Sequence, residues 1–133
     1  MYETTISKYL EMMRKLQVEP IHSFDTASRN IPDEPGVYVI CNNKEKRVIY
    51  VGRTKNLKRR ILRNHRSGNI EGSQFRKALG KSTGVSSEAE ITKFIMDNCS
   101  FQFLVLQIFE EAVRLEHFIT AILAPTLNVQ LRQ

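Results

Sequence analysis

Long apolar runs are missing from this chain of 133 residues. No stretch of about 18 apolar residues could span a bilayer, and residues 1–17 alternate charged and apolar side chains where a signal peptide would have an apolar centre. We therefore expect a soluble, cytoplasmic (intracellular) protein with no membrane partner. With 41% hydrophobic residues, the chain is long enough for one domain with its own core.

Cysteines are scarce as well. The chain has two, Cys41 and Cys99, and neither is accompanied by a second cysteine or a histidine at the spacing of a zinc site. These counts exclude a disulfide framework and a structural zinc site. Free thiols are expected in this protein.

Acidic side chains are absent from residues 53–66, although the whole chain holds 14 Asp and Glu against 20 Lys and Arg, a net charge of +6. A concentrated basic patch is typical of a protein that binds a polyanion such as nucleic acid, although it can also be only a solvated surface. The patch contains Arg53, Lys55, Lys58, Arg59, Arg60, Arg63 and Arg66, followed by Arg76, Lys77 and Lys81.

The N-terminal part of the chain differs in pattern from the rest. Apolar residues recur at helical spacing over residues 5–17, which predicts an amphipathic helix. Residues 19–35 hold three prolines and several turn formers, which predicts a loop. We expect two parts: an N-terminal helix and lead-in loop over residues 1–30, and a compact domain over residues 31–133.

The pattern after residue 35 predicts an α+β domain with a small antiparallel sheet. Two strands rich in β-branched and aromatic residues are separated by a short polar turn, which predicts a β-hairpin. Ser73 and a Ser-Glu-Ala-Glu capping box at residue 87 predict the starts of two helices. The expected elements are strands at 36–41, 47–51 and 101–108, and helices at 57–66, 74–79, 87–98 and 110–123.

Two polar residues of the predicted helix 57–66 face the domain. On a helical wheel at about 100° per residue, His65 falls between the inward-facing Ile61 and Leu62, and Arg60 lies on the flank of that face. An inward histidine can be a hydrogen-bonded core residue, and Arg60 can be an ordinary solvated cation. Neither residue indicates a functional site by itself.

Glu116 lies on the apolar face of the last predicted helix, among Leu115 and Ile119. A carboxylate there costs several kcal/mol unless a cation, a metal ion or a set of donors compensates it. Its partner could be a structural one, including Arg60 itself. Glu116 is therefore the residue for which physical chemistry alone most clearly requires a positive partner.

Tyr38 and Tyr50 are predicted on adjacent strands of the hairpin. They would share one face of the sheet if the turn lies near Lys44. Such a pair is often only packing.

Taken in order, these features resemble the GIY-YIG nuclease family over roughly residues 35–128. Gly36-Val37-Tyr38 and Tyr50-Val51-Gly52 resemble the two hairpin motifs that name the family, with valine in place of isoleucine. Further along the chain, the family's helix arginine, helix histidine, metal-binding glutamate and closing asparagine are matched by Arg60, His65, Glu116 and Asn128.

The resemblance implies a three-stranded antiparallel sheet flanked by helices, and a metal-dependent endonuclease that hydrolyses phosphodiester bonds in nucleic acid, expected to be DNA. One Mg²⁺ or Mn²⁺ ion would be held by Glu116, because the pattern offers no second carboxylate. The catalytic residues would be Tyr38, Tyr50, Arg60, His65 and Glu116. Gly36, Gly52 and Asn128 would be structural at the site.

The division of labour at the site stays open. Arg60 would clamp phosphate oxygens, and the general base could be Tyr38, Tyr50 or His65. We favour Tyr38 contacting the attacking water, with His65 and Tyr50 assisting. Flanking phosphates would be gripped by Arg53, Lys55, Lys58, Arg59 and Arg63.

The alternative function is a catalytically inactive module that keeps the fold and docks on nucleic acid or protein. The sequence does not choose between roles such as DNA repair and restriction. The N-terminal helix is a candidate surface for a homodimer or a protein partner, and residues 83–98 are extra length that could shape substrate access.

Overall fold

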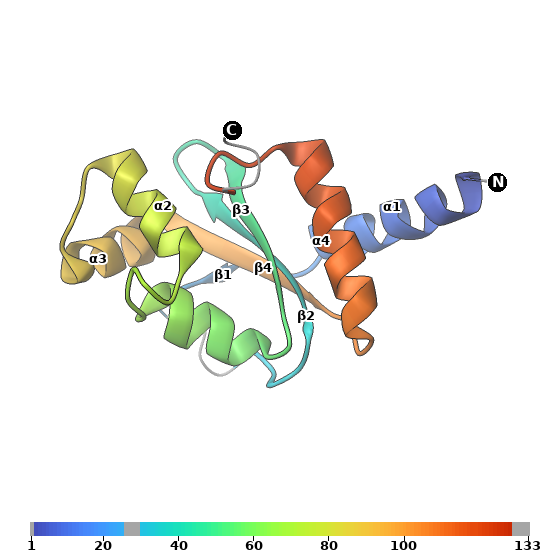
Figure 1. The fold of residues 1–133 in the computed structure, drawn as a ribbon, viewed down its shortest axis with the longest axis horizontal. Coiled ribbons are helices and arrows are strands. Elements are labelled where there is room, and N and C mark those ends of the chain that lie inside the picture. The colour runs from blue at the N-terminus through green and yellow to red at the C-terminus, as the bar shows by residue number, and fades with distance from the viewer. Residues whose placement is uncertain (1, 26–29, 129–133) are drawn as a thin grey trace.

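Four antiparallel strands form the central sheet of the protein, whose computed structural model describes residues 2–25 and 30–128 (Figure 1). The α+β class with an antiparallel sheet is confirmed. The expected number of three strands is one too few, because two residues of the predicted loop pair with the sheet edge. The strand order is β1-β4-β2-β3, with β1 at His22–Ser23, β2 at Gly36–Asn42, β3 at Arg47–Thr54 and β4 at Cys99–Val105.

The β2–β3 hairpin brings both motif tyrosines to one face. Tyr38 lies opposite Gly52 and Ile40 lies opposite Tyr50, so the tyrosines are two residues apart in register. Side chains at such positions point to the same face of a sheet. The register shifts once, between Ile40 and Cys41, and this shift lies beyond the tyrosine pair.

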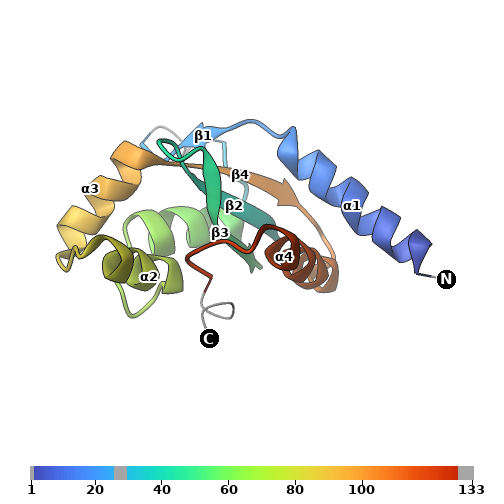
Figure 2. The ribbon, with the colours of Figure 1, turned by 90° about the horizontal axis from the view of Figure 1, so that it is seen from above.

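Helices cover both faces of the sheet (Figures 1 and 2). One core joins strand residues such as Ile40 and Phe101 to helices on the first face; the other joins residues such as Val39 and Val51 to helices on the second face. The first face carries η2 (Arg59–Arg66), α2 (Gln74–Thr83) and α3 (Glu88–Asn98), and the second carries α1 (Glu3–Gln17) and α4 (Phe109–Leu123).

The basic helix η2 is a π-helix, where an α-helix was expected. The backbone N–H of Ser67 donates to the carbonyl of Leu62, five residues earlier, at 3.1 Å. A π-turn is closed by a hydrogen bond over five residues, where an α-turn closes over four, so residues five apart lie closer to the same side of a π-helix than of an α-helix. Ile61, Leu62 and His65 are buried, as the helical wheel predicted.

Helix α2 runs past its predicted end. Ser73 caps it as expected, its Oγ accepting from the Arg76 N–H at 3.1 Å. The helix was expected to end at residue 79, before Gly80, but it continues to Thr83 and is capped by Gly84, whose φ of 77° favours glycine. Either glycine could serve as a stop by residue type alone.

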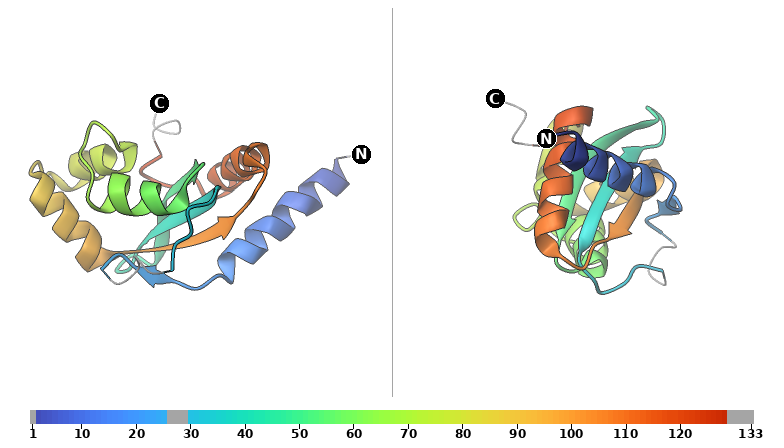
Figure 3. Two further views of the ribbon diagram at one scale, coloured as in Figure 1. Left: turned by 90° about the horizontal axis from the view of Figure 1, so that it is seen from below. Right: turned by 90° about the vertical axis from the view of Figure 1, so that its right-hand side faces the viewer.

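The N-terminal helix α1 packs on the second face of the sheet, beside α4. Tyr9, Met13 and Leu16 are buried there, whereas Tyr2 and Ile6 in its first turns are exposed. The first turns extend past the rest of the fold (Figure 3). Among the described residues, no helix is long and apolar enough to cross a membrane.

Arg76, expected to extend the basic surface patch, is fully buried and joins three helices. Its Nη1 donates to the carbonyls of His65 and Arg66 at 3.0 and 2.8 Å, and its Nη2 donates to the Glu88 carbonyl at 2.9 Å and to Glu88 Oε1 at 3.0 Å. These bonds satisfy carbonyls at the end of η2 that have no partner within the helix. The sequence placed Arg76 on the basic surface wrongly, because the pattern of charged residues shows where charge lies along the chain but not which side chains are buried.

We predict that Arg76→Met lowers the free energy of unfolding by about 3 kcal/mol, because buried carbonyls would lose their donors. Chemical denaturation followed by circular dichroism measures the change. Lys77→Met, at the exposed neighbouring position, is the matched control and should change stability by less than about 0.5 kcal/mol. Equal effects of the two substitutions would show that Arg76 does not hold the helices together.

Candidate active site

A cleft of about 630 Å³ lies where the two helical layers meet along β3. Residues of α4 line one side of it, and Arg60 of η2 with Gln74 at the start of α2 lines the other. Four of the five predicted catalytic residues line this cleft; His65 lies behind it. The lining residues include Tyr38, Tyr50, Arg60 and Glu116, with Gly52, Arg53, Gln74, His117, Thr120 and Asn128.

Tyr38 lies directly over Gly52. A Cβ atom at Gly52 would sit 2.3 Å from the Tyr38 hydroxyl oxygen, closer than any real contact. Tyr50 lines the same cleft, with its ring centroid 6.4 Å from that of Tyr38. The glycine of the second motif is therefore required by the tyrosine of the first motif. Gly36 is required similarly, since its Cβ would sit 2.3 Å from the carbonyl oxygen of Leu104.

His65 links Tyr38 to the start of α2. Its Nε2 lies 2.5 Å from the Tyr38 hydroxyl, and its Nδ1 lies 2.7 Å from Ser73 Oγ. The ring is fully buried, 5.6 Å from the Tyr50 ring and 5.4 Å from the Phe75 ring. Burial, reinforced by nearby arginines, holds the pKa of His65 well below its usual value. The imidazole is therefore neutral near pH 7.

Both tyrosines are protonated near neutrality. Burial raises the pKa of Tyr38 above its usual value, and neighbouring Tyr50 adds to this, while the Arg60 guanidinium opposes it. Burial also raises the pKa of Tyr50, again against Arg60. Arg60 is thus the group on the protein that most favours negative charge at this end of the cleft.

Glu116 is 3% exposed, as its place on the apolar face predicted. Its Oε1 accepts from Arg53 Nη1 at 2.6 Å, and its Oε2 accepts from the Thr120 hydroxyl at 3.2 Å. The compensating cation in the protein is therefore Arg53, from β3. Arg60, the structural partner that the sequence suggested, lines the same cleft.

Arg60 reaches the cleft from η2. It lies five residues before His65, a spacing that places both residues on one side of a π-turn. Its Nη1 is 3.4 Å from the Gly72 carbonyl, a weak bond that leaves most of its donors available.

Asn128 closes the outer edge of the sheet at the cleft. Its side-chain Oδ1 accepts from the Val51 N–H at 3.0 Å, and its Nδ2 donates to the Val51 carbonyl at 2.9 Å. The neighbouring Leu127 N–H donates to the Ile49 carbonyl at 3.0 Å. Asn128 therefore replaces a missing strand partner beside Tyr50 and Gly52.

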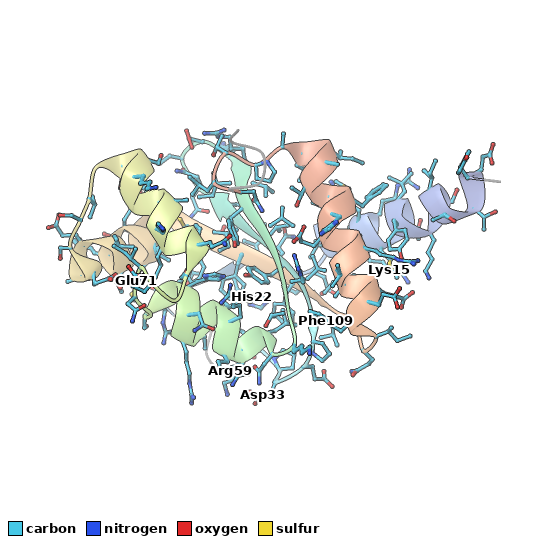
Figure 4. All side chains as sticks on the ribbon, in the orientation of Figure 1. Lys15, His22, Asp33, Arg59, Glu71 and Phe109 are labelled. Atoms are coloured by element: carbon cyan, nitrogen blue, oxygen red, sulfur yellow. The ribbon has the colours of Figure 1, made fainter. Side chains whose placement is uncertain are left out.

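The remaining basic residues divide between the cleft and the outer surface. Arg53 is engaged with Glu116, and Lys55 lies 5.3 Å over the Phe109 ring. Lys58 is half-buried, whereas Arg59 and Arg63 are exposed. Figure 4 shows Arg59 on the outer side of its helix and Phe109 at the base of α4.

Sequence reasoning missed four residues at the site. Gln74, His117 and Thr120 line the cleft, and Ser73 contacts His65 behind it. Ser73 was predicted only as a helix cap. The others carry no signal in the sequence beyond their proximity to Glu116 and to the predicted helix start.

The donor set at the cleft suits one hard cation. Glu116 is the carboxylate that lines it, and the described residues hold no group of three or more His, Cys, Asp or Glu that could hold a metal ion. A divalent ion here would take its other ligands from water or substrate, as Mg²⁺ commonly does. The residues fit such an ion, provided that Arg53 releases the carboxylate.

Comparison with known proteins extends this result. The sequence model of the GIY-YIG catalytic domain matches residues 34–119. UvrABC system protein C of Brucella abortus (strain 2308) is 30% identical over 104 residues, which are 78% of this chain and 14% of that protein. The same protein of Dictyoglomus thermophilum is 31% identical over 103 residues, which are 77% and 14%. The chain thus spans about a seventh of the length of these relatives.

Solved structures share the fold. Two tyrosine point mutants of the GIY-YIG N-terminal endonuclease domain of UvrC from Thermotoga maritima, each bound to its catalytic divalent cation, superimpose with TM-scores of 0.52 and 0.51. Both are 24% identical in sequence, and the match covers 80% of this chain and 94% of each of those chains. With the family model matched over most of the α+β domain and the motif tyrosines and Glu116 gathered in one cleft, the chain belongs to the GIY-YIG endonuclease family.

Proposed function

We propose that this protein cuts DNA by hydrolysing phosphodiester bonds with one divalent ion, Mg²⁺ or Mn²⁺, held by Glu116. The observation that carries this proposal is the convergence of two tyrosines, an arginine and a buried carboxylate on one cleft. Phosphodiester hydrolysis needs an activated water and neutralisation of a growing negative charge. Each residue type in the cleft suits one of these needs.

The divalent ion is supported by the chemistry of Glu116 and by the cation bound in the UvrC domains of the same fold. When bound, such an ion would neutralise charge on the phosphate and polarise a water molecule. A single carboxylate favours one ion over two. Two-ion sites need several protein ligands, and among the described residues that line this cleft Glu116 is the one carboxylate, with no group of three or more metal-ligating side chains.

The side chains of the cleft have distinct parts in this proposal. Arg60 binds a phosphate oxygen through its free donors. Tyr38 gives up its own proton to solvent through the cleft, and the resulting phenolate accepts a proton from the attacking water, while Tyr50 assists from the same cleft. His65 supports Tyr38, and Asn128 keeps the tyrosine-bearing strand in place.

A nucleic-acid substrate, which we take to be DNA, is supported by the basic helix that borders the cleft. Arg59 and Arg63 are exposed on η2, and Lys58 stands at its start. They would bind flanking phosphates without reading the sequence. Arg53 and Lys55 would join them when released from Glu116 and the Phe109 ring. The UvrABC relatives favour DNA repair over restriction as the setting.

The alternative is an inactive docking module on the same fold. The full set of cleft side chains argues for the nuclease, since a module that only binds would not need a buried carboxylate at the cleft. A substitution at Glu116 separates the two functions.

We predict that Glu116→Gln abolishes nicking of plasmid DNA in Mg²⁺ or Mn²⁺, with a loss of at least about 100-fold, because the ion loses its carboxylate. Gel assays with EDTA as the blank measure the rate, and a salt titration of DNA binding shows that the variant still binds. Glu110→Gln, on the exposed side of the same helix, is the control and should cut normally. If wild type and Glu116→Gln bind DNA but are equally inert, the docking alternative is correct.

Arg53 should compete with the divalent ion for Glu116. Arg53→Gln is expected to tighten Mn²⁺ binding roughly three- to tenfold, measured by calorimetry, because the 2.6 Å ion pair no longer has to open. Without the ion it should lower stability by about 2 kcal/mol, because Glu116 stays buried and loses its cation, although the 40% exposure of the Arg53 side chain weakens the pair. Arg60→Gln removes a charge from the same cleft but not from the ion pair. Equal tightening in both variants would mean that charge alone, and not competition, sets the affinity.

The pH dependence of cleavage should follow Tyr38 and not His65. The pKa of Tyr38 lies above its usual value, so its phenolate fraction rises about tenfold per pH unit across the neutral range. The pKa of His65 lies well below its usual value, so His65 stays neutral there. Single-turnover rates should rise continuously from pH 6 to 9. A plateau with a midpoint near 6.5 that disappears in His65→Gln would make His65 the titrating base.

A further inference from the structure

A buried chain of three side chains runs from the cleft to the start of α2. It joins the Tyr38 hydroxyl to His65 Nε2 at 2.5 Å and His65 Nδ1 to Ser73 Oγ at 2.7 Å. Tyr38 and His65 are fully buried, and Ser73 is 1% exposed. Distances alone do not fix which atom donates in either bond, because a neutral imidazole carries its proton on one of its two nitrogens.

Ser73 determines the direction of the chain. Its Oγ already accepts from the Arg76 N–H at 3.1 Å as the cap of α2. If Nδ1 of His65 carried the proton, both lone pairs of Oγ would be occupied, and the hydroxyl proton would be buried without an acceptor among the described residues. Buried donors are almost always satisfied. The hydroxyl proton of Ser73 therefore points at His65 Nδ1.

The same direction of hydrogen-bond donation, from Ser73 towards the cleft, continues through the His65 imidazole to Tyr38. With Nδ1 accepting, a neutral His65 carries its proton on Nε2 and donates it to the Tyr38 oxygen. The Tyr38 proton must then find another acceptor. Tyr38 is buried as a whole, but it lines the cleft and Ser73 does not, so a water molecule or substrate bound in the cleft is the acceptor within its reach. The one proton that has no acceptor within this series of hydrogen bonds is therefore that of the Tyr38 hydroxyl, and it lies at the end next to the cleft, where a bound molecule can accept it.

We infer that Ser73 is a positioning residue, which fixes the Nε2–H tautomer of His65 so that His65 donates to Tyr38 and Tyr38 presents its own proton to the cleft. In this arrangement His65 does not receive the proton of Tyr38. It stabilises negative charge on the Tyr38 oxygen, together with Arg60. The relevance to cleavage rests on the proposed nuclease function, but the tautomer does not.

A near-isosteric pair of substitutions tests the assignment. Asn and Asp are both good N-caps and differ in what they offer Nδ1. In Ser73→Asn, the amide oxygen can cap α2 while the amide N–H₂ donates to Nδ1, which keeps the wild-type tautomer. In Ser73→Asp, the carboxylate would accept from the backbone N–H at the start of α2 and also from His65 Nδ1, which draws the imidazole proton to Nδ1. Ser73→Thr keeps the hydroxyl and is the conservative control.

Ring ¹⁵N spectra of histidine at pH 8 report the tautomer directly, with the His65 signals assigned by their loss in His65→Gln. We expect Nε2 protonated and Nδ1 unprotonated in wild type, Ser73→Asn and Ser73→Thr, and Nδ1 protonated in Ser73→Asp. A protonated Nδ1 in wild type would overturn the inference, even if the aspartate variant fails to fold. An unchanged tautomer in a folded Ser73→Asp would overturn it too.

Cleavage provides the second readout. Ser73→Asn should cut at a rate near wild type, and Ser73→Asp should lose roughly tenfold or more in kcat, because Tyr38 loses a donor. Equal rates with opposite tautomers would refute the positioning role. If wild type shows the expected tautomer but cuts no DNA, the tautomer assignment stands and the proposed function fails.

Discussion

The contact between Tyr38 and Gly52 is the constraint on which the cleft depends. With a Cβ at residue 52, the Tyr38 ring could not lie across β3, and its hydroxyl would not reach His65 at 2.5 Å. The hairpin register sets this contact, because Tyr38 is paired with Gly52 across the two strands. The two motifs therefore act as one unit: the first supplies the ring, and the second supplies the space for it.

The other parts of the site are placed relative to this unit from both faces of the sheet. The π-helix brings Arg60 and His65 to the same side, and Arg76 holds the end of that helix by its carbonyls. From the opposite layer, α4 delivers Glu116 to the same cleft. Asn128 completes the edge of β3 between the two layers. A rigid sheet edge with helices on both sides thus allows residues far apart in sequence to meet around one cleft.

Much of this could be predicted from the sequence, because the spacing of residues along a strand or helix shows which side chains share one of its faces. The two-residue period of strands placed Tyr38 and Tyr50 together, and the helical period placed Glu116 in an apolar face. Properties that depend on tertiary contacts were not predictable. Strand β1 is two residues long and leaves no alternating pattern, and a π-turn changes hydrogen bonding more than it changes the pattern of apolar residues. Burial of Arg76 and the pairing of Arg53 with Glu116 required the arrangement of the helices, as did the contact of Ser73 with His65.

Anomalous diffraction from manganese tests the central claim most directly. Crystals of Tyr38→Phe grown with Mn²⁺ and a short DNA duplex would trap substrate in the cleft, since this variant lacks the hydroxyl proposed to contact the water. The account predicts one manganese peak per chain, coordinated by the Glu116 carboxylate and by a DNA phosphate oxygen, with Arg53 turned away from Glu116. Two peaks in the cleft, or a Glu116 carboxylate still paired with Arg53 beside bound DNA, would contradict it.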